Sequence, residues 1–126
     1  MGNNILGLGN DIIEIDRIRK SIATHQERFL NRIFTPKEQA YCLTYKDPAP
    51  HFAARFAAKE AVAKALGCGL GEKLSWLDLE ILNDPSGKPE VHCSPSARKR
   101  FDNPRFLLSM SHSREFADTV VLWVRD

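Results

Sequence analysis

Alternating apolar and polar residues from Ile5 to Ile15 predict a β-strand near the start of the chain. Its two faces carry different residues: Leu6, Leu8 and Ile12 on one, and Ile5, Gly7, Gly9, Asp11 and Ile13 on the other. The missing side chains of the two glycines either leave room for a bulky group beside Asp11 or let the strand pack tightly, with Asp11 at the surface. A G-x-G-x-x-G dinucleotide fingerprint is disfavoured, because Ile12 stands where its third glycine would be.

The segment from His51 to Leu66 predicts the longest helix, since it has no internal glycine or proline and Gly67 follows as a left-handed cap. On a helical wheel the small residues share one half: Ala54, Ala58, Ala61, Val62 and Ala65. The other half mixes aromatic and charged residues: Phe52, Arg55, Phe56, Lys59, Glu60 and Lys64. We expect the small half to press against a sheet or helix, and the charged half to face a partly buried cleft or subunit interface. A solvated face with a Glu60–Lys64 ion pair is the alternative.

The remaining segments complete the predicted fold. A short basic helix is expected over residues 16 to about 24, and a helix over residues 36 to about 44 begins with a capping box of Thr35 and Glu38. WLDLEILNDPSGKPEV predicts two strands joined by a DPSG turn, and SPSARKRF starts another helix. FLLSMSH and ADTVVLWV predict an antiparallel hairpin. We therefore predict an α+β fold, in which a mostly antiparallel sheet packs against a long helix and shorter helices, as one domain over residues 1–126.

Composition limits the class of protein. With 43% hydrophobic residues in 126 positions, the chain can bury a core without disulfides or a metal. Its three cysteines, Cys42, Cys68 and Cys93, are too far apart for a C-x-x-C pair or a zinc cluster, which indicates reduced thiols in a cytosolic protein. No apolar stretch approaches the roughly 18 residues of a membrane span, and the start lacks the pattern of a signal peptide. We expect a cytoplasmic protein without a membrane partner.

Basic residues are concentrated near the start of the chain, although the formal net charge is only +2. This basic cluster consists of Arg17, Arg19, Lys20, Arg28 and Arg32. It suits an acidic partner. A non-catalytic module that binds nucleic acid is one hypothesis, but no nucleic-acid motif and no run of stacking aromatic residues accompanies these arginines. We therefore expect no nucleic-acid partner.

Two further motifs have an ordinary structural interpretation when taken alone. His112 ends the FLLSMSH run on the face of Leu108 and Met110, which is more typical of a core or hairpin-end histidine than of a catalytic one. The serines of SMSHS lack a G-x-S-x-G elbow, so a serine nucleophile is not supported. The glycines of LGCGLG are interpreted first as cap and turn residues, and second as positions where a ligand approaches the backbone.

Three segments taken together resemble one family. GLGNDIIEIDRI, RFAAKEAVAKALGCG and SMSHSREFADTVVL follow in the order and at the spacing of the short bacterial holo-acyl-carrier-protein synthases, within the 4'-phosphopantetheinyl transferase superfamily. The resemblance covers essentially the whole chain. Its most specific parts are the Asp11 segment and the K-E-A-x-x-K-A-x-G run from Lys59 to Gly67. Asn10 departs from the pattern, since hydrophobic residues or threonine are more familiar before the acid.

The resemblance implies a reaction. Such enzymes transfer 4'-phosphopantetheine from coenzyme A to a serine of apo acyl carrier protein in fatty acid biosynthesis, and release adenosine 3',5'-bisphosphate. Asp11 and Glu60 would be the ligands of a catalytic Mg²⁺, which prefers few carboxylates together with phosphate oxygens and water. Lys64 would contact the diphosphate as a catalytic point charge. Either Glu60 or a water on the metal would take the serine proton.

The resemblance also implies binding residues and an assembly. Arg55 and His112 match positions near the nucleotide and its 3'-phosphate, and Gly67 would let the backbone approach the ligand. The family forms homotrimers with active sites at subunit interfaces, and Phe52 and Phe56 would then help to pack the assembly, while Lys59, Glu60 and Lys64 address ligand or partner charges. Acyl carrier protein is acidic, and the first basic helix would receive it through Arg17 and Arg28.

Overall fold

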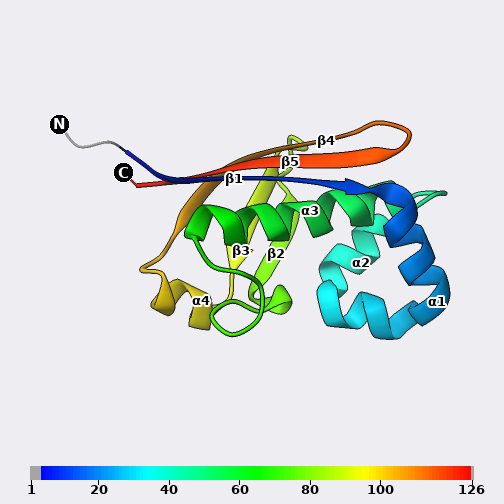
Figure 1. The fold of residues 1–126 in the computed structure, drawn as a ribbon, viewed down its shortest axis with the longest axis horizontal. Helices are drawn as coiled ribbons and strands as arrows, with labels where there is room; N and C mark the ends of the chain where they lie inside the picture. The colour runs from blue at the N-terminus through cyan, green and yellow to red at the C-terminus, as the bar shows by residue number, and fades with distance from the viewer. Residues whose placement is uncertain (1–3, 126) are drawn as a thin grey trace.

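A three-stranded antiparallel sheet lies along one long helix in the computed structural model, which describes residues 4–125 (Figure 1). Its strands, in spatial order, are β1 (Ile5–Glu14), β5 (Phe116–Val124) and β4 (Arg105–His112). β4 and β5 form the predicted hairpin, and β1 lies on the other side of β5, so that Leu8 and Leu107 both pair with Leu122. The predicted α+β fold with an antiparallel sheet is confirmed.

The inner face of this sheet packs on α3 (Ala49–Leu66), the helix with the small-residue half. A Cβ atom added to Gly9 would lie 1.9 Å from the carbonyl oxygen of Ala61, and one added to Gly7 would lie 2.0 Å from that of Ala65. The glycines therefore let the backbone of α3 approach β1 more closely than any side chain allows. Tight packing of the strand is confirmed, and the idea that these glycines leave room for a bulky group is wrong.

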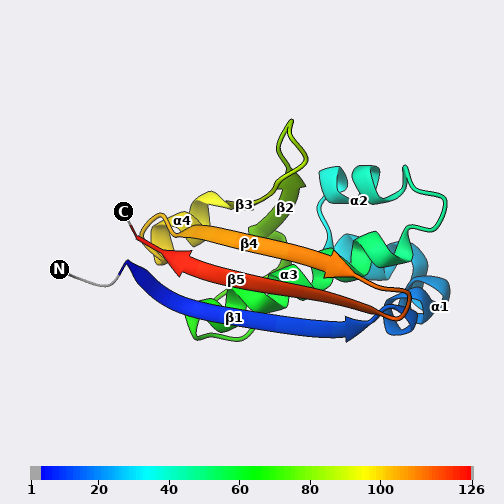
Figure 2. The same ribbon diagram turned by 90° about the horizontal axis from the view of Figure 1, so that it is seen from above.

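The other elements cover the lower face and the ends of α3 (Figures 1 and 2). Their bounds are α1 Ile15–Ile33, α2 Pro36–Cys42, the 3-10 turn η1 Trp76–Asp78, β2 Leu79–Asn83, β3 Pro89–Cys93 and α4 Pro95–Arg100. β2 and β3 form a separate two-stranded antiparallel sheet, and β3 also contacts β4. α1 and α2 lie at one end of α3, and α4 lies at the other. Within the described range, none of the helices is long and apolar enough to cross a membrane.

Helix α1 extends well beyond the predicted end near residue 24. At Gln26 the backbone leaves the helical region, with φ 49° and ψ −127°, and the helix resumes after this kink. Its C-terminal end is attached to α2 through Gln39, whose Nε2 donates to the carbonyl oxygens of Leu30 and Phe34 at 3.3 Å and 3.0 Å. A single residue, with no glycine or proline to mark it, therefore turns one helix into two segments.

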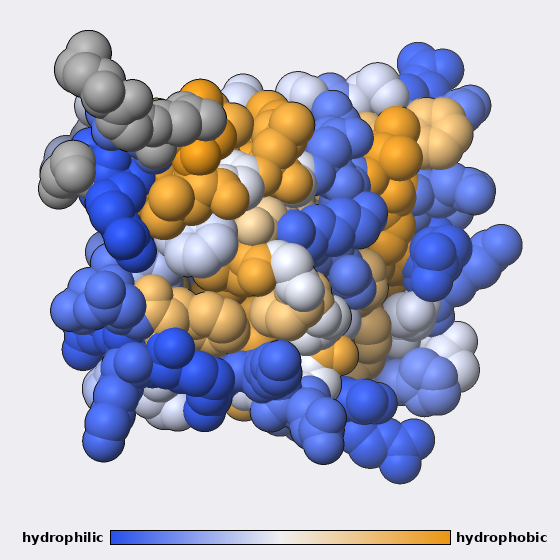
Figure 3. All heavy atoms as spheres, turned by 60° about the vertical axis from the view of Figure 1, so that its left-hand side comes forward, coloured by the Kyte–Doolittle hydropathy of each residue, from blue (hydrophilic) through white to orange (hydrophobic). Residues whose placement is uncertain are grey.

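The outer face of the three-stranded sheet carries exposed apolar side chains beside a few polar ones, among them Asn10 and Asp118. Leu8 and Ile12 are 63% and 61% exposed there, and Val120 and Leu107 lie on the same face. Figure 2 looks down on this face, and no helix of the described chain crosses it. Figure 3, in which the left-hand end of Figure 1 is turned forward, shows hydrophobic side chains gathered in the middle of the view, with hydrophilic residues around and among them. A large apolar surface of this kind is typical of an interface with another chain.

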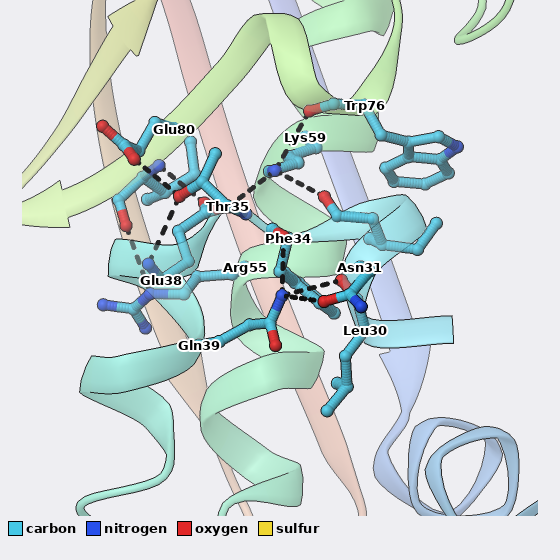
Figure 4. A network of polar contacts seen from close by, with 12 residues as sticks. Leu30, Asn31, Phe34, Thr35, Glu38, Gln39, Arg55, Lys59, Trp76 and Glu80 are labelled. Atoms are coloured by element: carbon cyan, nitrogen blue, oxygen red, sulfur yellow. Dashed lines mark hydrogen bonds and ion pairs between the residues drawn. The ribbon is translucent and has the colours of Figure 1, made fainter. Parts of the chain in front are cut away.

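A buried ion pair joins α2 and α3 inside the subunit (Figure 4). Lys59 and Glu38 are both fully buried, and Lys59 Nζ donates to Glu38 Oε1 at 2.8 Å. The same ammonium donates to the carbonyl oxygens of Ile33 at 2.6 Å and Trp76 at 3.0 Å, while Glu38 Oε2 accepts from the Ile81 N–H at 2.7 Å. Burial lowers the pKa of Lys59, and Glu38 opposes that shift. This pair connects five segments of the chain at one point.

Two expectations about the charged half of α3 are wrong. Lys59 does not address a ligand, because its charge is used inside the fold. Phe52 does not pack an assembly, because it is fully buried against Phe34, with ring centroids 4.8 Å apart. Phe56 is partly buried and packs on Trp76 at 4.7 Å. Lys59 is thus buried, whereas Lys64, on the same half of the helical wheel, is exposed. A helical wheel does not separate these two positions, because it ignores where along the helix each residue lies.

Candidate active site

Asp11 and Lys64 bring β1 and the last turns of α3 together. Asp11 lies on the inner face of the sheet, and its Oδ1 accepts from Lys64 Nζ at 3.0 Å. The same ammonium donates to the main-chain carbonyl oxygen of Asn10 at 2.9 Å. The Lys64 side chain is still 53% exposed, so it remains accessible to a ligand. Lys64 therefore pairs with the strand, and the alternative of an ion pair with Glu60 does not describe the structure.

Glu60 lies one turn earlier on α3 and is partly buried. Burial raises the pKa of Glu60 above its usual value, and the nearby Asp11 carboxylate raises it further, whereas Lys64 and Arg17 act in the opposite direction. Among residues 4–125, no donor forms a hydrogen bond with the Glu60 carboxylate. The structure thus places two carboxylates and two cations, from three different elements, in one small region.

The carboxylate oxygens in this region fit a hard divalent cation that also binds a ligand. The described residues contain no group of three or more His, Cys, Asp or Glu side chains able to enclose a metal. Mg²⁺ does not need such a cage, because it commonly binds through one or two carboxylates and takes its other ligands from water and phosphate. The Glu60 carboxylate, raised in pKa beside Asp11 and without a hydrogen-bond donor, is the acceptor that such an ion would satisfy.

Arg55 and His112 line a pocket of about 390 Å³ between α3, β4 and the β2–β3 turn. Arg55 is 3% exposed, and its Nε donates to the Ile81 carbonyl oxygen at 3.2 Å. Its guanidinium also donates to Asn83 Oδ1 at 3.3 Å and lies over the Tyr41 ring, 4.4 Å from the centroid. These contacts hold the charge of Arg55 rigidly at the wall of the pocket, as anion recognition requires.

Sequence reasoning missed two residues that line this pocket, His51 and Lys88, and Tyr45 beside it. Tyr45 and His51 stack with their ring centroids 3.5 Å apart and an interplanar angle of 15°. The His51 ring also meets the His112 ring edge to face at 5.6 Å, and Lys88 from the β2–β3 turn lines the same cavity. Nothing in the local pattern around KDPAP marks Tyr45 or His51, because only the tertiary fold brings that loop to the end of β4.

The remaining predicted site residues are Gly67 at the end of α3 and Arg17 and Arg28 on α1. Gly67 is the left-handed C-terminal cap of α3, with φ 77°, and its N–H bonds to the carbonyl oxygens of Ala63 and Lys64. A Cβ atom there would meet nothing within 4 Å, so the backbone conformation, and not crowding, calls for glycine. Arg17 and Arg28 are exposed on α1, before and after the Gln26 kink.

The chain belongs to the 4'-phosphopantetheinyl transferase superfamily, whose family model matches residues 7–118. A curated relative from Protochlamydia amoebophila, named holo-acyl-carrier-protein synthase, is 55% identical over 118 residues, which are 94% of this chain and 97% of that protein. The crystal structure of a holo-acyl-carrier-protein synthase from Helicobacter pylori in complex with coenzyme A matches with a TM-score of 0.84 and 37% identity, over 92% of this chain and 98% of that one. A Bacillus anthracis synthase in complex with CoA (3',5'-ADP) matches with a TM-score of 0.85 and 38% identity, over 98% of this chain and 100% of that one.

Proposed function

We propose that the chain transfers the 4'-phosphopantetheine group from coenzyme A to a serine of apo acyl carrier protein, giving the holo carrier needed for fatty acid synthesis. The observation that carries this proposal is the cluster of Asp11, Glu60 and Lys64, held between β1 and α3. The proposal is supported by family membership over residues 7–118 and by relatives that bind coenzyme A or its nucleotide portion.

In the reaction, the serine Oγ–phosphorus bond forms and the bond between that phosphorus and the leaving adenosine 3',5'-bisphosphate oxygen breaks. Lys64 binds the diphosphate, exchanging part of its contact with Asp11 for phosphate oxygens. Asp11 and Glu60 would hold Mg²⁺, and the ion would supply neutralisation of the diphosphate charge. The serine proton goes to Glu60 or to a water.

The nucleotide end of coenzyme A binds at the pocket of Arg55 and His112. Its 3'-phosphate meets the guanidinium of Arg55, which the contacts with Asn83 and Ile81 keep in one orientation. Lys88 adds a third basic side chain at the pocket wall. Gly67 borders the path of the ligand at the end of α3, close in sequence to Lys64. The acidic carrier protein docks on α1 through Arg17 and Arg28.

The working assembly is a homotrimer with active sites at subunit boundaries. The uncovered apolar face of the three-stranded sheet supports a contact between copies of the chain, because a surface with Leu8 and Ile12 more than half exposed is costly in water. β1 carries both this face and Asp11, so the assembly face and the catalytic cluster share one strand.

Intact-mass measurement tests the function directly. Apo acyl carrier protein, coenzyme A and Mg²⁺ are incubated with the protein, and the carrier mass should increase by one phosphopantetheine group. A reaction without the protein is the control. A carrier mass that stays unchanged with saturating coenzyme A and metal would overturn the proposed function.

A further inference from the structure

We propose that His51 and His112 form a proton-linked anion site, in which the 3'-phosphate of coenzyme A draws a proton onto the histidine pair. The inference rests on the proposed function and deepens it. It assigns a binding role to His51 and predicts that affinity for coenzyme A falls as the pH rises.

The geometry places His51 at the pocket without any other evident task. Its ring is held on both sides, stacked on Tyr45 at 3.5 Å and meeting the His112 ring at 5.6 Å. Tyr45 is in turn fixed by a 2.8 Å hydrogen bond between its hydroxyl and that of Tyr41. Within the described chain, the His51 side chain forms ring contacts but no hydrogen bond or ion pair. The ring is thus positioned firmly while its nitrogens remain free to bind a ligand.

Charged groups of both signs surround the two rings, and the cations Arg55 and Lys88 line the pocket itself. The titratable groups around His51 are Tyr41 of α2, Tyr45 and Asp47 of the following loop, Arg55 of α3 and Lys88 of the β2–β3 turn. His112 also lines a second cavity, whose charged residues are Glu14, Asp16, Arg19, Asp47, Arg114 and Glu115. In the free protein, burial lowers the pKa of His51. The nearby His112 and Arg55 side chains lower the pKa of His51 further, whereas Asp47 raises it. A second positive charge on the pair is therefore disfavoured until an anion arrives.

Binding of a phosphate reverses this balance. A 3'-phosphate carries close to two negative charges near neutral pH, and its position beside Arg55 brings it next to both imidazoles. The pKa of His51 then rises on binding, so the complex holds more protons than the free protein. The pKa of His51 in the free protein lies below the ordinary histidine value. Below that pKa the extra affinity for coenzyme A is fully present, and it is lost as the pH rises through the higher pKa of His51 in the complex.

Calorimetry measures the linked proton. Coenzyme A is titrated into the Mg²⁺-loaded wild type at pH 7 in two buffers of different ionisation enthalpy, and the difference gives the protons exchanged per site. We expect net uptake on the order of half a proton, and a dissociation constant that rises roughly three- to tenfold between pH 6 and pH 8. His51→Phe keeps a ring on Tyr45 but cannot be protonated, and it should remove most of the uptake. Titration of the 3'-phosphate itself is common to both proteins and cancels in the comparison.

A ligand control avoids any dependence on the variant. Dephospho-coenzyme A lacks only the 3'-phosphate, and with the wild type it should bind more weakly and without the linked uptake. Equal uptake by wild type and His51→Phe, or equal uptake with the two ligands, would overturn the inference while leaving the transferase function intact. Failure of the wild type to bind coenzyme A at all would overturn the proposed function and the inference together.

Discussion

Two carboxylates at the site differ in surroundings, and this difference governs what their replacement does. Asp11 is paired with Lys64, whereas Glu60 has no hydrogen-bond donor among the described residues and a raised pKa. Glu60→Gln keeps the shape but is a poorer Mg²⁺ ligand, so we expect transfer to fall about 100-fold or more with little change in thermal stability. Asp11→Asn should lose similar activity and also release Lys64. Near-full activity of Glu60→Gln at saturating Mg²⁺ would contradict a role for Glu60 at the metal.

Unlike the carboxylates of the site, the Lys59–Glu38 pair has a structural role, because both charges are fully buried. Lys59→Met leaves the Glu38 carboxylate without its partner and should cost about 3–5 kcal/mol of the free energy of unfolding. Lys59→Met combined with Glu38→Gln should cost clearly less than the sum of the two single changes. Urea unfolding of the four proteins measures this, and strict additivity would show that the pair does not act as a unit.

At the scale of elements, the contact between β1 and α3 depends on two missing side chains. Gly9→Ala places a Cβ atom 1.9 Å from the Ala61 carbonyl oxygen, so strand and helix must separate. We expect a loss of about 1–3 kcal/mol or more in stability, together with lower activity because Asp11 moves away from Lys64. Gly69→Ala is the matched control, since its Cβ meets nothing within 4 Å and should be tolerated. Equal melting temperatures for the two variants would contradict this account of the packing.

Helix α1 is the element expected to receive the carrier. Arg28→Glu should raise the Michaelis constant for acyl carrier protein roughly tenfold, and leave coenzyme A affinity nearly unchanged. The wild-type rate should also fall with ionic strength. Arg98→Glu makes the same charge change on exposed α4, at the other end of the molecule, and should have little effect. If the two variants behave alike, net charge and not docking on α1 explains the result.

For the whole molecule, the proposed trimer links the exposed apolar sheet face to transfer activity. Val120→Asp places a charge in the middle of that face and should reduce both oligomer size and transfer activity, although it removes no catalytic group. Leu77→Asp, at an exposed position in η1 outside the sheet, is the control. Sedimentation and activity are measured on the same samples. A fully active wild-type monomer would contradict the trimer.

How much of this could be predicted from the sequence depended on the range of the interactions. Period-two and period-3.6 patterns identified the strands and α3, and the Thr35–Glu38 capping box was correct because it is local. The bond from Glu38 to Lys59 was missed, since it joins positions 21 residues apart. His51 and Tyr45 were missed for the same reason. The kink at Gln26 was missed because no glycine or proline signals it.

That kink gives α1 two independent anchors. The segment before Gln26 continues directly from β1, which carries Asp11, while the segment after it is tied to α2 by the amide of Gln39. A carrier protein that touches Arg17 and Arg28 at once would therefore rest on both attachments. The bend would act as a spacer that sets how far the carrier's serine stands from the carboxylates. A change in the angle at this one residue would alter that distance without altering any charge on the docking surface.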